Sequence, residues 1–325
     1  LGRVSDLDRM VELADELAKE PVNQRNLLAR AKAYGHVHRF AKALALLDQL
    51  DAMQKRPSAA TREARGVVLM ALGKYREAFA RLRQDGKPPN TSKLGLEAMV
   101  LGRLGHYDDA EAKFSQAESV FRGVSPFVLA WLRFQRGSMW DRAGQSDKAQ
   151  RHYQRAVFHL PEHAHAVSHL AAFVSAAEAE RMYEALLKTS DDPEHRAALG
   201  TLRNARQAGS GDALIEEAKS QYRVLMKKLP LAFADHAGWF WLGAGGDPHR
   251  ALEVATLNLG ARRTSEAYAL KIASLLAVGD KDEACQTADD AAQVEPLAPG
   301  LRATCAAAFD ACGRSLRAEE LRQKP

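Results

Sequence analysis

The chain of 325 residues has few cysteines, few aromatic residues and no long hydrophobic run. Its cysteines, Cys285, Cys305 and Cys312, form no Cys-x-x-Cys pair, which excludes a zinc knuckle or a thioredoxin-type redox motif. No segment approaches the roughly 18 consecutive apolar residues of a membrane span, so we expect no membrane-spanning helix in this chain. Aromatic residues make up only 7% of the chain. Because alanine and leucine dominate the apolar set, the composition favours closely packed helices over strands.

Catalytic motifs are missing as well. There is no Gly-x-Ser-x-Gly elbow, no His-Glu-x-x-His pair and no phosphate-binding loop. The glycine-rich stretches 209–211 and 243–246 lack both a preceding strand and a following Lys-Ser/Thr, so we interpret them as turns between helices. With no residue set on which a reaction could depend, we predict that the chain is not an enzyme and uses no cofactor.

The charge balance gives no sign of a nucleic-acid partner. The net charge is +5, but 46 basic residues face 41 acidic ones and are spread along the whole chain. Basic pairs such as Arg262-Arg263 and Lys227-Lys228 are typical of solvated helix faces rather than of a phosphate-binding stripe. We therefore predict no nucleic-acid binding.

What the chain does contain is an internal repeat in which glycine is followed, after four residues, by alanine. The repeat occurs five times, at Gly73–Ala78, Gly105–Ala110, Gly144–Ala149, Gly279–Ala284 and Gly313–Ala318. From the first glycine to the last is close to seven periods of about 34 residues, the length of one helix–turn–helix unit. Glycine ends a first helix by adopting a left-handed backbone at low cost, and alanine allows two helices to cross closely.

Two further positions strengthen the pattern. A large residue follows the alanine by four places, as in Leu82, Phe114 and Tyr153, and prolines such as Pro161 and Pro230 close second helices. With these features the chain resembles the tetratricopeptide repeat family, most closely over residues 137–161. The resemblance implies an all-α, right-handed α–α superhelix (solenoid) of helix–turn–helix repeats, with a concave groove that takes up an extended peptide or partner helix.

The repeats are not equally regular along the chain. Residues 1–23 are expected to form a partial or capping helix, 24–163 an N-terminal repeat array, 164–230 irregular repeats, and 231–325 a C-terminal array. The first residue is Leu1 rather than methionine, so we expect that an upstream segment has been removed. A lost leader slightly favours an extracytoplasmic location, periplasmic or secreted, over a cytoplasmic one.

Histidines and cysteines offer alternative chemistry. His165 and His169 are four residues apart and share a helix face that could chelate a metal, but no thiolate lies nearby, and a polar exposed face is the preferred interpretation. For the cysteines we prefer small buried thiols, with a disulfide from Cys285 to Cys305 or to Cys312 as the alternative.

The family resemblance places particular side chains on the groove. Counting from the alanine of each repeat separates groove positions from core positions and places Trp241 in the core. The leading hypothesis is a scaffold or adaptor that binds a protein or peptide there. Alternatives are a metal- or small-ligand-binding protein that uses the 163–169 region, and a structural subunit of a bacterial envelope assembly. The predicted groove residues are Arg103, Trp131, Phe134, Arg142, His165, His169, His236 and Trp239.

Overall fold

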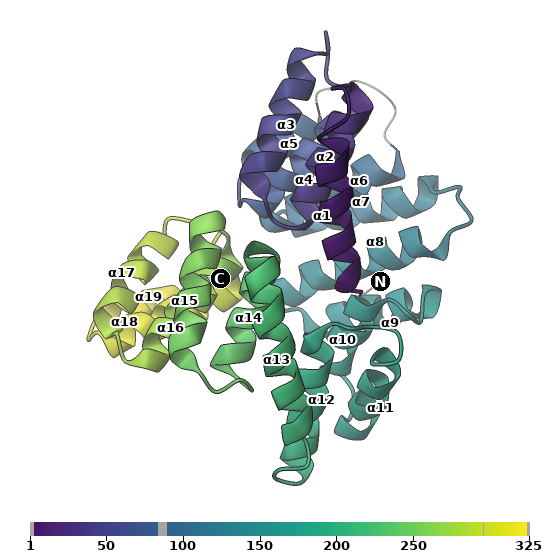
Figure 1. The fold of residues 1–325 in the computed structure, drawn as a ribbon. Coiled ribbons are helices and arrows are strands. Elements are labelled where there is room, and N and C mark those ends of the chain that lie inside the picture. The colour runs from purple at the N-terminus through teal and green to yellow at the C-terminus, as the bar shows by residue number, and fades with distance from the viewer. Residues whose placement is uncertain (1–2, 84–89, 295, 324–325) are drawn as a thin grey trace. The chain divides into compact units, whose positions relative to one another are not determined.

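The computed structural model describes residues 3–83, 90–294 and 296–323, and these residues form nineteen α-helices and no β-strand (Figure 1). Contacts between Cα atoms divide the chain into two units. Unit 1 extends to Asp141 and resumes from Gln145 to His195, whereas unit 2 comprises Arg142–Gly144 and the chain from Arg196 onward.

The helices of unit 1 are α1 (Ser5–Leu17), α2 (Gln24–His36), α3 (Phe40–Ala52), α4 (Ala59–Ala71), α5 (Tyr75–Leu82), α6 (Thr91–Arg103), α7 (Tyr107–Val120), α8 (Pro126–Arg142), α9 (Ser146–His159), α10 (Ala164–Ala171) and α11 (Ala176–Leu186). The remaining helices are α12 (Pro193–Arg206), whose first residues belong to unit 1, then α13 (Asp212–Lys228), α14 (Pro230–Leu242), α15 (Pro248–Ala261), α16 (Ser265–Val278), α17 (Lys281–Ala291), α18 (Pro299–Ala311) and α19 (Ser315–Gln323).

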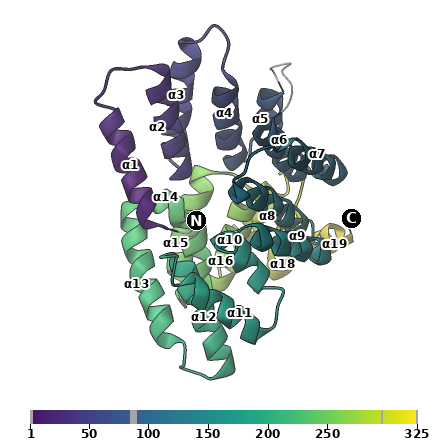
Figure 2. The ribbon, with the colours of Figure 1, turned by 90° about the vertical axis from the view of Figure 1, so that its right-hand side faces the viewer.

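Consecutive helices pack as pairs within each unit. In unit 1, α2 contacts α3, α4 contacts α5 and α6 contacts α7, and Figure 2 shows these helices side by side. Unit 2 has the same arrangement in α14 with α15, α16 with α17, and α18 with α19. The predicted fold class, an all-α solenoid of helix–turn–helix repeats, is therefore confirmed. The main boundary between the two units, after His195, falls inside the segment 164–230 that we predicted to be irregular. The division of the chain into four predicted segments stays a prediction.

The repeat glycines have the backbone that their position requires. All five, Gly73, Gly105, Gly144, Gly279 and Gly313, have a positive φ between 72° and 84°. In the first repeat, His38 stands five residues before Ala43, at the place of the glycine, and it alone among the described non-glycine residues has a positive φ, of 56°. A non-glycine residue tolerates this backbone only at a cost, which explains why the sequence pattern missed the turn.

Side-chain caps start the first helices of several repeats. Asn23 accepts a hydrogen bond from the backbone N–H of Asn26 at α2, and Asn90 accepts one from Lys93 at α6. Thr264 does the same at the start of α16. The second helices α3, α5, α7 and α9 begin without such a cap, directly after the tight turn. Local sequence thus marks the start of these three first helices, while α14 and α18 begin without a side-chain cap.

The core lies where the two helices of a pair cross. The repeat alanines are completely buried, and a small residue on the first helix often faces a large one on the second. At Gly137 an added Cβ atom would lie 2.7 Å from the Tyr153 ring, and at Gly66 it would lie 2.9 Å from Leu82. Glycine at these two positions is therefore a packing requirement, because any larger residue would push the helices apart.

A network of charged side chains joins α7 to α8 inside unit 1. Arg136 is 7% exposed and forms ion pairs with Glu111 and Glu118, with its Nε donating to Glu111 Oε2 at 2.8 Å. The indole Nε1 of Trp140 donates to the same Glu111 oxygen at 3.0 Å. Burial alone would raise the pKa of Glu111, but the hydrogen bond and charge of Arg136 outweigh it and lower that pKa. Glu111 is thus held ionised between two repeats.

None of the helices in the described part of the chain is long and apolar enough to cross a lipid bilayer.

Candidate functional site

The first helices of unit 1 present one continuous face. Successive first helices contact each other, α2 with α4 and α4 with α6. Side chains on this side are exposed or partly buried rather than packed in the core. We call this surface the first-helix face and define it by Arg25, Lys32 and His36 of α2, Glu63 and Val67 of α4, Met99 and Arg103 of α6, Trp131 and Phe134 of α8, and His165 and His169 of α10.

Phe134 is the centre of an aromatic and histidine cluster on this face. Its ring centroid lies 5.3 Å from His163, 5.9 Å from His165 and 5.4 Å from His169. The ring of Tyr153, a core residue of α9, is 6.0 Å away. The sequence-predicted residues Phe134, His165 and His169 are therefore brought together, over the junction of α8, α9 and α10.

A carboxylate completes the cluster. The hydroxyl of Tyr153 donates a hydrogen bond to Asp141 Oδ2 at 3.1 Å, and His169 Nδ1 lies 3.7 Å from the same oxygen. The His169 side chain is 43% exposed, so its ring is oriented by Asp141 and Tyr153 while it still faces solvent. Counting along the repeat gives Asp141 or Arg142 as the groove residue at this point, but the contact of Asp141 with Tyr153 depends on how α8 and α9 pack.

His163 has a structural role within this group. It is 5% exposed, and its Nδ1 accepts a hydrogen bond from the backbone N–H of Ala166 at 3.2 Å, which caps α10. Burial lowers the pKa of His163, and this favours the neutral ring that the cap requires. Its ring also stacks on Phe127. Of the three histidines at 163–169, His163 is thus a buried helix cap, whereas His165 and His169 are exposed.

The described residues contain no group of three or more His, Cys, Asp or Glu side chains arranged to hold a metal ion. Asp141 lies near His169, but it does not make such a group with His165 and His169 among the described residues.

Trp131 and Arg103 lie further along the same face. Trp131 is partly buried and packs against α6, so close to Gly95 that a Cβ atom there would lie 3.1 Å from the indole. The guanidinium of Arg103 lies 5.9 Å from the ring centroid of Tyr75. Trp131 therefore takes part in packing between repeats while remaining partly exposed, and Arg103 adds a positive charge to the same face.

The other predicted residues belong to unit 2. Trp239 on α14 is 46% exposed whereas Trp241 is 2% exposed, as the repeat count predicts. His236 Nε2 lies 3.9 Å from Asp235 Oδ1, and Asp235 also pairs with Arg262. Arg142 ends α8 and groups with unit 2. His236 and Trp239 thus share α14, whereas Arg142 lies on α8.

The cysteines differ from the preferred expectation of buried thiols. Cys285 and Cys312 form a disulfide, while Cys305 is a buried free thiol. The preferred interpretation was wrong because Cys312 lies just past the end of α18, where the chain turns back toward α17. That turn brings its Cα atom to 6.3 Å from that of Cys285, within disulfide range.

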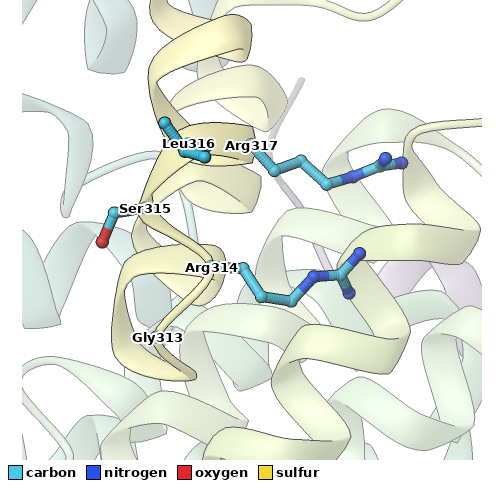
Figure 3. A pocket seen from close by; sticks show the side chains of 5 residues that line it. All are labelled: Gly313, Arg314, Ser315, Leu316 and Arg317. Carbon is cyan, nitrogen blue, oxygen red and sulfur yellow. The ribbon is translucent and has the colours of Figure 1, made fainter.

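A surface hollow lies next to this disulfide, at the turn between α18 and α19. It is lined by Gly313, Arg314, Ser315, Leu316 and Arg317. Figure 3 shows the Arg314 and Arg317 side chains extending in the same direction, away from Ser315 and Leu316. Both guanidiniums pair with Asp289, at 2.6 and 3.4 Å.

No family model matches the chain. The chain is 30% identical over 140 residues to a probable biofilm formation methyltransferase, WspC, of Pseudomonas aeruginosa, and the match covers 37% of this chain and 31% of the relative. The chain thus spans about a third of the length of this curated relative.

Solved structures resemble the fold over most of this chain. The human IFIT1 dimer with m7Gppp-AAAA aligns with a TM-score of 0.51 and 12% identity, over 98% of this chain and 75% of the other. A tetratricopeptide repeat protein of Parabacteroides merdae aligns over 77% of this chain and 98% of its own, with a TM-score of 0.44 and 15% identity. At 12% identity, the IFIT1 likeness shows an all-helical repeat fold and nothing about the ligand.

Proposed function

We propose that this chain is a tetratricopeptide-type scaffold that binds an extended segment of a partner protein on the first-helix face of unit 1, without catalysing a reaction. The observation that carries the proposal is the cluster around Phe134. A partly buried aromatic ring surrounded by exposed His165 and His169, with Trp131 one turn away, offers an apolar anchor with polar groups around it. Binding energy at protein surfaces concentrates in such aromatic and arginine-rich centres.

The charge of the face favours an acidic partner. Arg25, Lys32 and Arg103 contribute three positive charges to the first-helix face, and Glu63 and the neighbouring Asp141 contribute two negative charges, so a net positive charge remains. An acidic segment with one or two large apolar residues would complement both the charge and the aromatic centre. The face has no dense block of arginine and lysine, which is the feature that phosphate backbones require.

The test uses a displayed library of random dodecapeptides, followed by fluorescence anisotropy with the enriched peptides. We expect enrichment of acidic sequences that contain an aromatic or aliphatic residue. Because a truncated aromatic anchor typically costs 2 kcal/mol or more, Trp131→Ala should weaken peptide binding about thirtyfold. The matched control is Trp239→Ala, an exposed tryptophan of unit 2 whose loss should leave the affinity unchanged.

Two outcomes would overturn the proposal, and a third would move the test to other side chains. Equal binding by wild type and Trp131→Ala would place the binding surface elsewhere. Loss of the folded state in Trp131→Ala would show that Trp131 acts only in packing, in which case His165→Glu with His169→Glu tests the same face through exposed side chains. Tighter binding of single-stranded RNA than of any peptide would assign the face to nucleic acid instead.

A further inference from the structure

The disulfide of unit 2 is asymmetric in its surroundings. Cys285 lies on α17 and is 7% exposed, whereas Cys312 lies at the C-terminal end of α18 and is partly exposed. Cys312 is therefore the more accessible of the two residues to an incoming reagent. The more accessible sulfur is the one that a nucleophile would attack.

The buried sulfur faces a positive charge. Arg314 Nη1 lies 3.5 Å from Cys285 Sγ. The guanidinium is held in this place from two other sides, by Asp289 at 2.6 Å and by the ring of Phe309 at 4.9 Å. A neighbouring guanidinium stabilises a thiolate and makes that sulfur a better leaving group. Cys285 is consequently placed to leave as a thiolate when Cys312 is attacked.

The third cysteine does not compete. Cys305 is completely buried on α18, and burial, assisted by the charge of Asp289, raises the pKa of its thiol to about 11. A thiol in that state is almost entirely protonated near neutral pH, and the thiol form does not act as a nucleophile. Exchange within the protein is therefore confined to the Cys285–Cys312 pair.

We propose that Cys285–Cys312 is a thiol–disulfide exchange site that a small thiol bearing carboxylate groups opens at Cys312. The thiolate of the reagent attacks Cys312 Sγ, a new sulfur–sulfur bond forms to the reagent, and the bond to Cys285 breaks. Its electron pair stays on Cys285 as a thiolate beside Arg314. A second reagent thiolate then attacks the reagent sulfur of the mixed disulfide, releases oxidised reagent and leaves Cys312 as a thiolate that takes a proton from water.

The charge around the Cys285–Cys312 disulfide favours a thiol that bears carboxylate groups. Arg314 and Arg317 line the adjacent hollow and share the single carboxylate of Asp289, so this cluster keeps a net positive charge. Their side chains extend to the same side of α19 in Figure 3. An anionic thiol gains attraction there that a neutral or cationic thiol lacks.

The first experiment establishes the bond in the full chain, purified without reductant. Alkylation before and after unfolding, followed by mass spectrometry, should find one free thiol, at Cys305, that reacts only after unfolding. It should also find a peptide pair linked through Cys285 and Cys312. Three free thiols in the protein purified under air would overturn the proposal.

The second experiment measures the rate of reduction by glutathione, 2-mercaptoethanol and cysteamine, each normalised to its rate with a small model disulfide. Glutathione should be fastest. Arg314→Gln should slow its reaction about tenfold through the loss of thiolate stabilisation. The matched control is Arg322→Gln, on the helix that follows Arg314 and paired with Asp310. Equal rates for both variants, or no preference for glutathione, would refute the assignment.

The site of attack is tested by single cysteine variants. In Cys285→Ser the remaining Cys312 should form a one-to-one mixed disulfide with oxidised glutathione, and in Cys312→Ser the buried Cys285 should not. A stable adduct on Cys285 instead would reverse the proposed direction of the exchange.

Discussion

Between α7 and α8 of unit 1, successive repeats are joined by charged side chains, whereas between α17 and α18 of unit 2 they are joined by a disulfide. In unit 1, Arg136 is held between Glu111 and Glu118 with little access to solvent. In unit 2, the Cys285–Cys312 bond lies beside an apolar cluster that includes Ile272 and Phe309. In both regions the helix pairs nevertheless contain a turn at a glycine with positive φ and a completely buried alanine.

The difference shows which part of a repeat is free to vary. The turn and the crossing alanine decide whether a helix pair forms, so they recur in both units. The contact between one pair and the next needs only complementary surfaces, because each repeat packs against its neighbours alone. Ion pairs and a disulfide both satisfy that need. They make the two units sensitive to different conditions, unit 1 to pH and unit 2 to thiols.

The largest expected effect comes from breaking the charged junction of unit 1. Arg136→Ala removes the main partner of Glu111 and leaves a partly buried carboxylate with only the Trp140 hydrogen bond. Removal of one partner from a buried pair is costly, so we expect a loss of about 3 kcal/mol in the free energy of unfolding, after allowance for the partial exposure of Glu111. Urea unfolding followed by circular dichroism measures this.

The control for this variant is an exposed ion pair. Arg181 and Glu178 pair on α11 with side chains 68% and 45% exposed, so Arg181→Ala should leave stability nearly unchanged. Hydrogen exchange should show that Arg136→Ala loosens α7 and α8 and leaves α14 to α17 protected. A uniform loss of protection in both units would mean that the charged junction is not local to unit 1.

The next effect tests what the two units share. Ala149 in unit 1 and Ala284 in unit 2 are both completely buried at the crossing of a helix pair. Leucine at either position would overpack the crossing, so each of Ala149→Leu and Ala284→Leu should destabilise the protein by about 1–3 kcal/mol in thermal or urea unfolding. A cost at only one of them would show that the crossing is tight in one unit alone.

Sequence alone predicted the repeat and much of its local geometry. The five glycine–alanine spacings located turns whose glycines all have positive φ, because glycine is the residue with the lowest cost there. The burial of Trp241 and the exposure of Trp239 also followed from counting along a helix. The first turn lacks the glycine–alanine spacing because His38 has the same backbone without being glycine.

The candidate site was predictable only in part. Phe134, His165 and His169 were placed on one face by counting positions from the alanine of each repeat, and this count needs only the sequence of each helix pair. That His163 would cap α10, and that Asp141 would bind Tyr153, depends on how α8, α9 and α10 meet. The disulfide was only the second choice from sequence for a similar reason. Spacing along a helix separates Cys305 from Cys312 but gives no distance to Cys285 on the neighbouring helix.

The smallest expected effect separates the units by pH. His152 on α9 lies close to the charged junction, and burial, then the positive charge of Arg136, lowers its pKa from 6.5 to about 4. Arg133 and Arg155 act in the same direction, while Glu111 opposes them. Below pH 6.5 the unfolded chain therefore binds a proton that the folded chain takes up only near pH 4. The stability that the neutral ring contributes is complete above pH 6.5 and is lost as the pH falls from 6.5 to 4.

From pH 7.5 to pH 5 this coupling should cost unit 1 between about 1 and 2 kcal/mol, and His152→Gln should remove that part of the pH dependence. Urea unfolding at both pH values, for wild type and variant, gives the difference directly. Hydrogen exchange corrected for its intrinsic pH dependence should place the loss in α7 to α9, with α14 to α17 as the internal reference. An unchanged pH dependence in His152→Gln would mean that this ring titrates alike in the folded and unfolded chain. The charged junction would then contribute to stability without making unit 1 sensitive to pH through this histidine.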